Sequence, residues 1–208
     1  MKLHISFDMP DLERAITVAH SIADHADILE VGSLLILKYG IHAVQTFREK
    51  FPGITILADA KIVDRGKDSV SLLAAAGADW ITVMAGAGRD VIHSACSTAH
   101  HHGKKIMLDL IDAPSPGQSA MDAQNMGVDA LLFHKPFDAT DNSTLLDQWD
   151  MVRGNTKLPI FVSAKIDREN ISTITGLHPD GLVIGESITL ADDPAQEARF
   201  FAQACTKR

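Results

Sequence analysis

The sequence is poor in the features that mark secreted and membrane proteins. Among its 208 residues are only two cysteines, Cys96 and Cys205, which lie far apart in segments with helical periodicity. No apolar run approaches the roughly 18 to 20 residues that a membrane-spanning helix needs. Residues 1–8 do not have the basic and then apolar character of a secretion signal. We therefore expect reduced thiols, a cytoplasmic location and no membrane partner.

Positive charge is also scarce. Lys and Arg number 19 against 27 Asp and Glu, which gives a formal net charge of -8. Such a surface repels nucleic acids, so no nucleic-acid partner is expected, and a phosphorylated substrate could bind only where positive charge is concentrated locally. Hydrophobic residues make up 46% of the chain. This content suits one sizeable core, and we expect a single catalytic domain over residues 1–208.

Short strand-like runs recur along the chain at intervals of about 25 residues, which leaves room for one strand, one helix and two short loops. The eight runs are Leu3–Phe7, Ile28–Val31, Thr55–Ala58, Trp80–Val83, Lys105–Leu108, Ala130–Phe133, Pro159–Val162 and Leu182–Ile184. Between them are helix-period segments, among them Leu12–Asp24, Ile36–Glu49, Ser69–Ala76, Val91–His101 and Ser143–Arg153. The early runs are almost continuously apolar, as expected of parallel strands buried on both faces.

Eight strand–helix units can form a closed barrel or an open, doubly wound sheet. The Gly-x-Gly-x-x-Gly segment of dinucleotide-binding sheets is missing after the first strand, where residues 7–11 read FDMPD. A small internal repeat places an aspartate just ahead of four strands, at Asp27, Asp79, Asp129 and Asp180. We predict an α/β fold of the (β/α)8 TIM-barrel type.

Polar side chains follow nearly every predicted strand. In chain order they are Asp8, Glu30, Asp59, Lys61, Asp109, His134 and Ser163, with Gly185 after the last strand. In a (β/α)8 barrel these positions meet at the C-terminal face, where active sites lie. A single aspartate there often only caps the next helix. Five ionisable strand ends at one mouth indicate a catalytic site instead.

The most informative segment is residues 59–64, DAKIVD. The two-residue spacing puts Asp59 and Lys61 on the same side of an extended strand. Asp64 lies beyond the strand end and could reach across a subunit boundary. Several carboxylates around one mouth repel one another unless a cation joins them.

Such a cation can be identified from the ligands available. Glu30 and Asp59 supply the hard oxygen ligands that suit Mg²⁺, and a bound Mg²⁺ would stabilise an enediolate. His134 is then the expected general acid–base, because its pKa can lie near neutrality.

These residues resemble the orotidine-monophosphate decarboxylase suprafamily, whose hallmark is Asp-x-Lys-x-x-Asp at the end of the third strand. The closer resemblance is to its metal-dependent branch, 3-hexulose-6-phosphate synthase and 3-keto-L-gulonate-6-phosphate decarboxylase. Residues 28–32 (ILEVG), 57–64 (LADAKIVD) and 77–83 (GADWITV) are similar to that branch, as are residues 187–189 and 191–195. The similarity covers nearly the whole chain.

The resemblance implies a role for each residue of the predicted site. It implies Mg²⁺ on Glu30 and Asp59. The groups around the enediolate would be Asp8, Lys61, Asp109 and the proton shuttle His134. It further implies a homodimer with shared active sites, each of which receives Asp64 from the partner subunit.

Two positions favour the synthase over the decarboxylase. The synthase condenses formaldehyde with ribulose 5-phosphate, and the decarboxylase removes CO₂ from 3-keto-L-gulonate 6-phosphate, both through a 1,2-enediolate. The decarboxylase carries Glu after the fifth strand and Arg three residues beyond the histidine. This chain has Asp109 and Phe137 there. The synthase is therefore the favoured activity, and the decarboxylase is the alternative.

The segments that bind phosphate in the family are altered here. The family has glycine pairs after the last two strands, or Gly-Arg after the eighth; this chain has Ala164-Lys165 and Gly185-Glu186. A family stretch after the sixth strand is replaced by residues 138–142. The expected substrate-binding set is Ser163, Lys165, Gly185, Glu186 and Ser187.

The glutamate in this set matters most, because it would repel a phosphate dianion. Lys165 could offset Glu186, either by pairing with it or by binding the phosphate directly. A further alternative is a non-catalytic barrel that binds another ligand or a partner protein.

Overall fold

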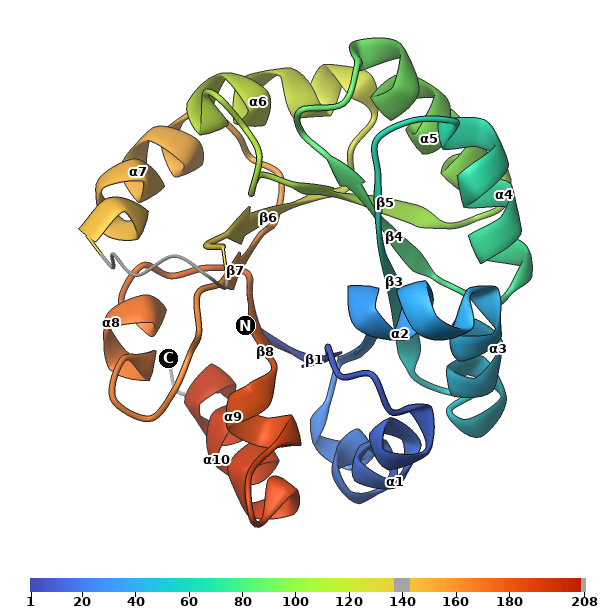
Figure 1. The fold of residues 1–208 in the computed structure, drawn as a ribbon. Coiled ribbons are helices and arrows are strands. Elements are labelled where there is room, and N and C mark those ends of the chain that lie inside the picture. Colours follow the sequence, from blue (N-terminus) through green and yellow to red (C-terminus); the bar gives the residue numbers. More distant parts are fainter. Residues whose placement is uncertain (137–142, 207–208) are drawn as a thin grey trace.

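In this computed structural model, which describes residues 1–136 and 143–206, the chain folds as a closed (β/α)8 barrel (Figure 1). Its parallel strands pair in chain order, and β8 closes the barrel against β1. The strands are β1 (Lys2–Phe7), β2 (Ile28–Val31), β3 (Thr55–Ile62), β4 (Trp80–Met84), β5 (Lys105–Asp109), β6 (Ala130–His134), β7 (Ile160–Ser163) and β8 (Gly181–Ile184). The predicted TIM barrel is confirmed.

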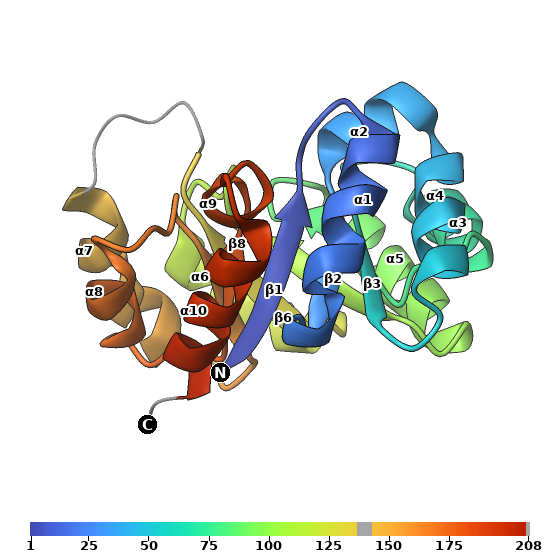
Figure 2. The ribbon, with the colours of Figure 1, turned by 90° about the horizontal axis from the view of Figure 1, so that it is seen from below.

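Helices cover the outside of the strands. They are α1 (Leu12–Ile22), α2 (Ser33–Tyr39), α3 (Ile41–Lys50), α4 (Gly66–Ala75), α5 (Arg89–His101), α6 (Pro116–Ala123), α7 (Ser143–Gly154), α8 (Ile171–Thr175), α9 (Glu186–Thr189) and α10 (Pro194–Thr206), with 3-10 turns at Ala23–His25 and Gln124–Met126. Figure 2 shows the N-terminus and the end of α10 on the same side of the barrel, and the Met1 amine donates to the carbonyl of Cys205 at 3.2 Å. Within the described ranges, no helix combines the length and apolarity needed to cross a membrane.

Two predicted elements differ from the structure. The segment Ile36–Glu49 is divided into α2 and α3, because Gly40 has a φ of +61° that ends the first helix. The third strand is longer than Thr55–Ala58 and continues to Ile62 through a register shift against β4. Both cysteines are buried and free, as predicted.

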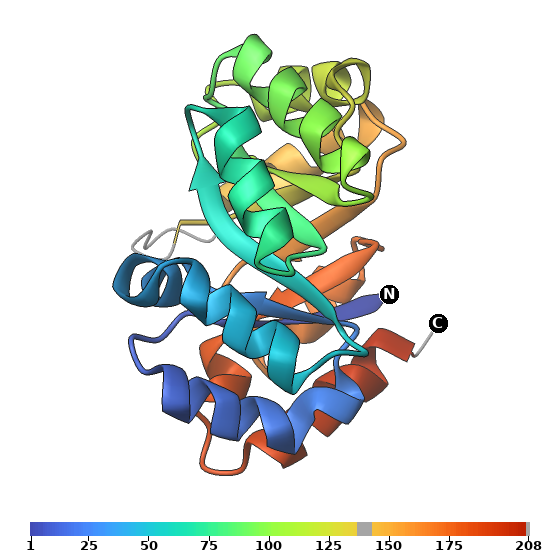
Figure 3. The same cartoon turned by 90° about the vertical axis from the view of Figure 1, so that its right-hand side faces the viewer.

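The apolar core has two parts. One fills the space between strands and helices, where α3, α4 and α5 pack against β3 and β4 (Figure 3). The other fills the barrel interior and includes Ile28, Leu57, Met107 and Phe161. A Cβ on Gly181 would lie 2.4 Å from the Phe161 ring, so this glycine makes room for the phenyl group inside the barrel.

The aspartate repeat joins neighbouring strands at the N-terminal end of the barrel. Each carboxylate accepts the backbone N–H of the second or first residue of the preceding strand, and each aspartate N–H donates to the carbonyl of that same residue. The pairs are Asp27 with Leu3, Asp79 with Ile56, Asp129 with Ile106 and Asp180 with Ile160, with all eight distances between 2.8 and 3.1 Å. These strand ends therefore keep their N–H groups bonded where the ladder would leave them without a partner.

Candidate active site

A cavity of about 500 Å³ opens at the C-terminal ends of the strands. Of the residues predicted for the site, all except Asp64 and Asp109 line it. Asp109 lies directly beneath, fully buried, in contact with Lys61 and His134. The C-terminal face of the barrel thus brings the predicted catalytic groups together, as the strand pattern indicated.

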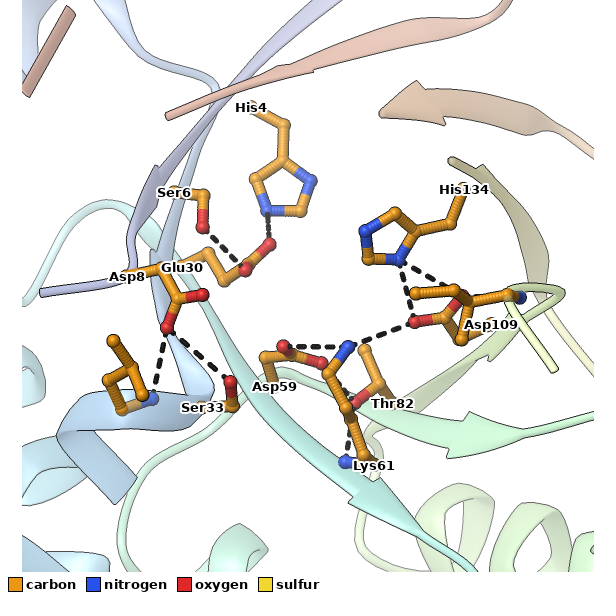
Figure 4. A network of polar contacts seen from close by, with 12 residues as sticks. His4, Ser6, Asp8, Glu30, Ser33, Asp59, Lys61, Thr82, Asp109 and His134 are labelled. Carbon is orange, nitrogen blue, oxygen red and sulfur yellow. Dashed lines mark hydrogen bonds and ion pairs between the residues drawn. The ribbon is translucent and has the colours of Figure 1, made fainter. Parts of the chain in front are cut away.

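Lys61 lies between two buried carboxylates (Figure 4). Its Nζ is 3.1 Å from Oδ2 of Asp59 and 3.1 Å from Oδ2 of Asp109. The backbone at Lys61 has a φ of +45°, and its N–H donates to Oγ1 of Thr82 at 2.9 Å. Burial by itself would lower the pKa of Lys61, but Asp59 and Asp109 raise it above its usual value. The lysine is therefore held as a cation between the two acids.

Asp59 has an unusual affinity for a proton. Burial, followed by repulsion from Glu30 and Asp109, raises its pKa to about 6 although Lys61 and Thr82 oppose the shift. Oγ1 of Thr82 donates to Oδ1 of Asp59 at 2.8 Å. A carboxyl with a raised pKa beside a second buried acid indicates a site that lacks positive charge.

Glu30 is fixed from the neighbouring strand β1. Oγ of Ser6 donates to its Oε1 at 2.6 Å, and Nε2 of His4 lies 2.7 Å from its Oε2. Burial would raise the pKa of Glu30, but His4, Ser6 and Lys61 outweigh burial and hold the pKa below its usual value. Glu30 pairs in register with Leu57, two residues before Asp59, so the two acids stand on adjacent strands and the same face.

The donor set of Glu30 and Asp59 fits a divalent cation. Both side chains are carboxylates, both are buried, and the raised pKa of Asp59 shows the charge deficit that a cation would relieve. In the described part of the chain, no group of three or more His, Cys, Asp or Glu side chains is arranged to hold a metal. Two protein ligands would leave the other positions to water and substrate, which is the usual way in which Mg²⁺ is bound.

His134 is oriented by Asp109. Its Nδ1 lies 2.9 Å from Oδ2 and 3.2 Å from Oδ1 of that carboxylate, whose Oδ1 also accepts the N–H of Ile111 at 3.0 Å. Burial would raise the pKa of Asp109, but His134 and Lys61 lower it, so the carboxylate stays ionised. Because Asp109 holds Nδ1, Nε2 is the nitrogen that can exchange a proton with a ligand in the cavity.

Asp8 lines the cavity but also has a structural role. Its Oδ1 accepts the N–H of Leu34 at 2.9 Å and lies 3.4 Å from Oγ of Ser33, at the first turn of α2. A Cβ on Gly32 would lie 2.6 Å from the carbonyl oxygen of Phe7, so this glycine allows the ends of β1 and β2 to approach closely. Asp8 therefore caps α2, the helix that follows the neighbouring strand β2, whereas the next helix in the chain, α1, is capped by Asp11.

The predicted substrate-binding residues lie around the mouth, where Ser163, Lys165, Gly185, Glu186 and Ser187 all line the cavity. Oγ of Ser187 donates to the carbonyl of Ile166 at 2.7 Å. Glu186 begins α9, and Lys165 has a φ of +46°. The pairing of Lys165 with Glu186 stays a prediction.

Asp64 lies outside this cavity. It is exposed, and its Oδ1 accepts the N–H of Arg65 at 2.7 Å. Its expected contribution to a partner subunit stays a prediction. Phe137 and residues 138–142, which bear on the choice of reaction and on phosphate binding, lie outside the described residues.

Four residues of the site were missed by the sequence analysis: His4, Ser6, Thr82 and the buried Lys135. A signal for two of them was present, because His4 and Ser6 alternate along β1 and Asp8 follows the strand at the same spacing. Thr82 could be found only from the pairing of β3 with β4, which the sequence does not provide.

Residues 1–201 match the family described as Orotidine 5'-phosphate decarboxylase / HUMPS. The chain belongs to this family. It is similar to 3-hexulose-6-phosphate synthase 2 of Staphylococcus saprophyticus, with 32% identity over 203 residues that cover 96% of this chain and 94% of that protein.

Two solved structures resemble the chain closely. With 3-hexulose-6-phosphate synthase from Salmonella typhimurium the TM-score is 0.91 and the identity 31%, and the match covers 98% of both chains. With 3-keto-L-gulonate-6-phosphate decarboxylase from Vibrio cholerae the TM-score is 0.84 and the identity 26%, over 98% of this chain and 96% of that chain. The resemblance to the synthase and decarboxylase branch is confirmed.

Proposed function

We propose that this protein is a Mg²⁺-dependent carbon–carbon lyase that condenses formaldehyde with ribulose 5-phosphate, as a 3-hexulose-6-phosphate synthase does. The observation that carries the proposal is the continuous contact from Asp59 through Lys61 and Asp109 to His134 beside the cavity. The 32% identity to a named synthase over almost the whole chain supports it.

The residues of this chain divide the work. Glu30 and Asp59 would hold Mg²⁺, which when bound supplies positive charge beside the two oxygens of an enediolate. Lys61, kept protonated by its two carboxylates, adds a hydrogen-bond donor and a charge at the same place. His134, with Nδ1 fixed by Asp109, takes the C1 proton of ribulose 5-phosphate through Nε2.

The test compares the two reactions of the branch on the purified protein. One assay contains ribulose 5-phosphate, formaldehyde and Mg²⁺, and the other contains 3-keto-L-gulonate 6-phosphate and Mg²⁺. We expect the condensation to be faster, and both reactions to be lost in Lys61→Ala and in excess chelator. Full activity in chelator would contradict the metal requirement.

The same comparison separates the alternatives. A faster decarboxylation would favour the second candidate, which the similarity to the Vibrio cholerae decarboxylase keeps open. No turnover in either assay would favour a non-catalytic barrel that binds another ligand or a partner protein. The intact set of Asp59, Lys61, Asp109 and His134 argues against that third reading.

A homodimer with shared sites is the proposed assembly. Apolar side chains are exposed on α2 and beside Asp64 in the sequence. Leu37 on α2 is 81% exposed, Val63 is 61% exposed, and α2 packs against β3, which precedes Val63. Large apolar side chains left in water at one place favour burial against another protein surface. A second copy placed there would also bring its own Asp64 into the contact.

A further inference from the structure

A histidine that the proposed reaction does not use contacts Glu30, which lines the cavity. His4, on β1, is fully buried inside the barrel. Its ring meets the Phe161 ring edge to face, with centroids 6.0 Å apart and planes at 77°. Phe161 occupies this position because Gly181 has no side chain in the way. An imidazole in such apolar surroundings is destabilising unless its polar atoms are satisfied.

The polar edge of His4 is directed at Glu30 (Figure 4). Neither ring nitrogen has a partner in hydrogen-bond geometry among residues 1–136 and 143–206, but Nε2 lies only 2.7 Å from Oε2 of Glu30, whereas no contact of Nδ1 is seen there. A proton on Nδ1 would be buried with nothing described to receive it, so we assign the ring proton to Nε2, facing the carboxylate.

Ser6 completes the contact from the same strand. Its Oγ donates to Oε1 of Glu30 at 2.6 Å, so one side chain of β1 faces each carboxylate oxygen. The register explains why both can reach, because Ser6 pairs with Glu30 and His4 pairs with Ile28, two residues earlier on β2. His4 and Ser6 thus approach Glu30 along the same interior face of β1.

We propose that His4 is a positioning residue that holds the carboxylate of Glu30 in place for the divalent cation. The inference rests on the proposed function, since it takes Glu30 as a ligand. A glutamate has three side-chain torsions to fix before it can bind a cation, and a partner that fixes them in advance strengthens binding. A histidine that only filled space would stabilise the fold without affecting the cation.

The experiment measures Mn²⁺ affinity from the EPR signal of the free ion, with Mn²⁺ as the probe of the site. His4→Leu removes the donor, and His4→Gln returns an N–H near the position of Nε2. We expect His4→Leu to weaken Mn²⁺ binding about 10- to 100-fold, the range found for partners of metal ligands. His4→Gln should recover most of the loss. Met107→Leu, also in the barrel interior, is the packing control and should bind Mn²⁺ as the unaltered protein does.

Urea unfolding of each variant separates positioning from packing. Wild-type affinity in His4→Leu, or a His4→Gln variant as weak as His4→Leu, would overturn the inference. If His4→Leu does not fold, His4→Phe keeps a ring without a donor, and the same comparison with His4→Gln decides.

Glu30→Gln distinguishes the two proposals. If the unaltered protein binds no Mn²⁺, or Glu30→Gln binds it equally well, the proposed ligand is wrong. If only His4→Leu binds normally, the positioning role alone is wrong.

Discussion

At the scale of single residues, the buried acids of the site are only partly neutralised by nearby positive charge, and this alters their pKa values. Asp59 shows this most directly, with a pKa raised to about 6 by burial and then by Glu30 and Asp109. A raised carboxyl pKa favours the folded state most at low pH. Asp59's contribution to stability is therefore full below its unfolded pKa of about 3.9 and is lost as pH rises through about 6.

The first prediction follows from that proton. A divalent cation must displace it, so Mn²⁺ or Mg²⁺ affinity should fall about tenfold per pH unit below pH 6 and level off above it. Calorimetric titrations between pH 5 and pH 8 measure this. Asp59→Asn should bind weakly, with the slope below pH 6 removed. A slope that is unchanged in Asp59→Asn would assign the proton to another group.

The second prediction concerns the mouth. Glu186 stands where the resembling family has Gly or Arg beside phosphate, so Glu186→Gly should bind ribulose 5-phosphate more tightly, by roughly 1 to 3 kcal/mol. Glu186→Gln, which keeps the side chain but not its charge, is the matched control and should gain part of this. Calorimetry at equal ionic strength measures both. Equal or weaker binding in both variants would mean that phosphate lies elsewhere.

At the scale of elements, the sequence predicted which segments form strands better than it predicted how they end. All eight strands were located, because buried parallel strands are nearly continuous apolar runs. The far end of β3 was not, since Asp59 and Lys61 interrupt the apolar pattern while the strand continues to Ile62. The sequence predicts one long helix through Gly40, because the helical period continues on both sides of this residue.

The candidate site was predicted to a similar depth. Residues that follow a strand are visible in the sequence, and the structure brings them to one cavity. His4 and Thr82 lie within strands that were treated as apolar, and their roles depend on register between strands. The aspartate repeat is visible in the sequence, but its hydrogen bonds are not, because they depend on which strands lie side by side.

The third prediction tests that repeat. Asp79→Ala removes the acceptor for Ile56 N–H and the partner of Arg48 and Lys104, and should lower the free energy of unfolding by about 1 to 3 kcal/mol. Asp79→Asn keeps an acceptor and should lose less. Urea unfolding at pH 7 measures both, and Asp150→Ala, exposed on α7, is the control. If Asp79→Ala loses no more free energy of unfolding than the control, the hydrogen bonds of the aspartate repeat, here called the aspartate clamp, do not stabilise the fold.

The pH dependence of this clamp has a defined sign. Burial would raise the pKa of Asp79, but the Ile56 N–H, Lys104 and Arg48 lower it. Its contribution to stability is therefore present above the unfolded pKa and lost as pH falls below it. The difference between the unaltered protein and Asp79→Asn should shrink in acid.

At the scale of the whole molecule, the proposed assembly is a dimer whose sites need both chains. The fourth prediction mixes inactive Lys61→Ala with inactive Asp64→Ala. After subunit exchange, half of the dimers are mixed and each has one complete site, so activity should return to about a quarter of the unaltered level. Lys61→Ala mixed with Asp59→Asn is the control. Each site would take both of these residues from the same chain, so every site in the mixed dimer still carries one substitution and no activity should return. No recovery in verified heterodimers would contradict shared sites.

The four aspartate clamps also divide the barrel into quarters, since each joins an odd-numbered strand to its successor. Glu30 belongs to the first quarter, Asp59 and Lys61 to the second, and Asp109 and His134 to the third. The proposed cation would tie the first quarter to the second, and the Lys61–Asp109 ion pair ties the second to the third. The reacting groups thus connect neighbouring quarters of the barrel, and no quarter by itself contains all of them. A barrel that opened between two of these quarters would lose its active site while its strands were still formed.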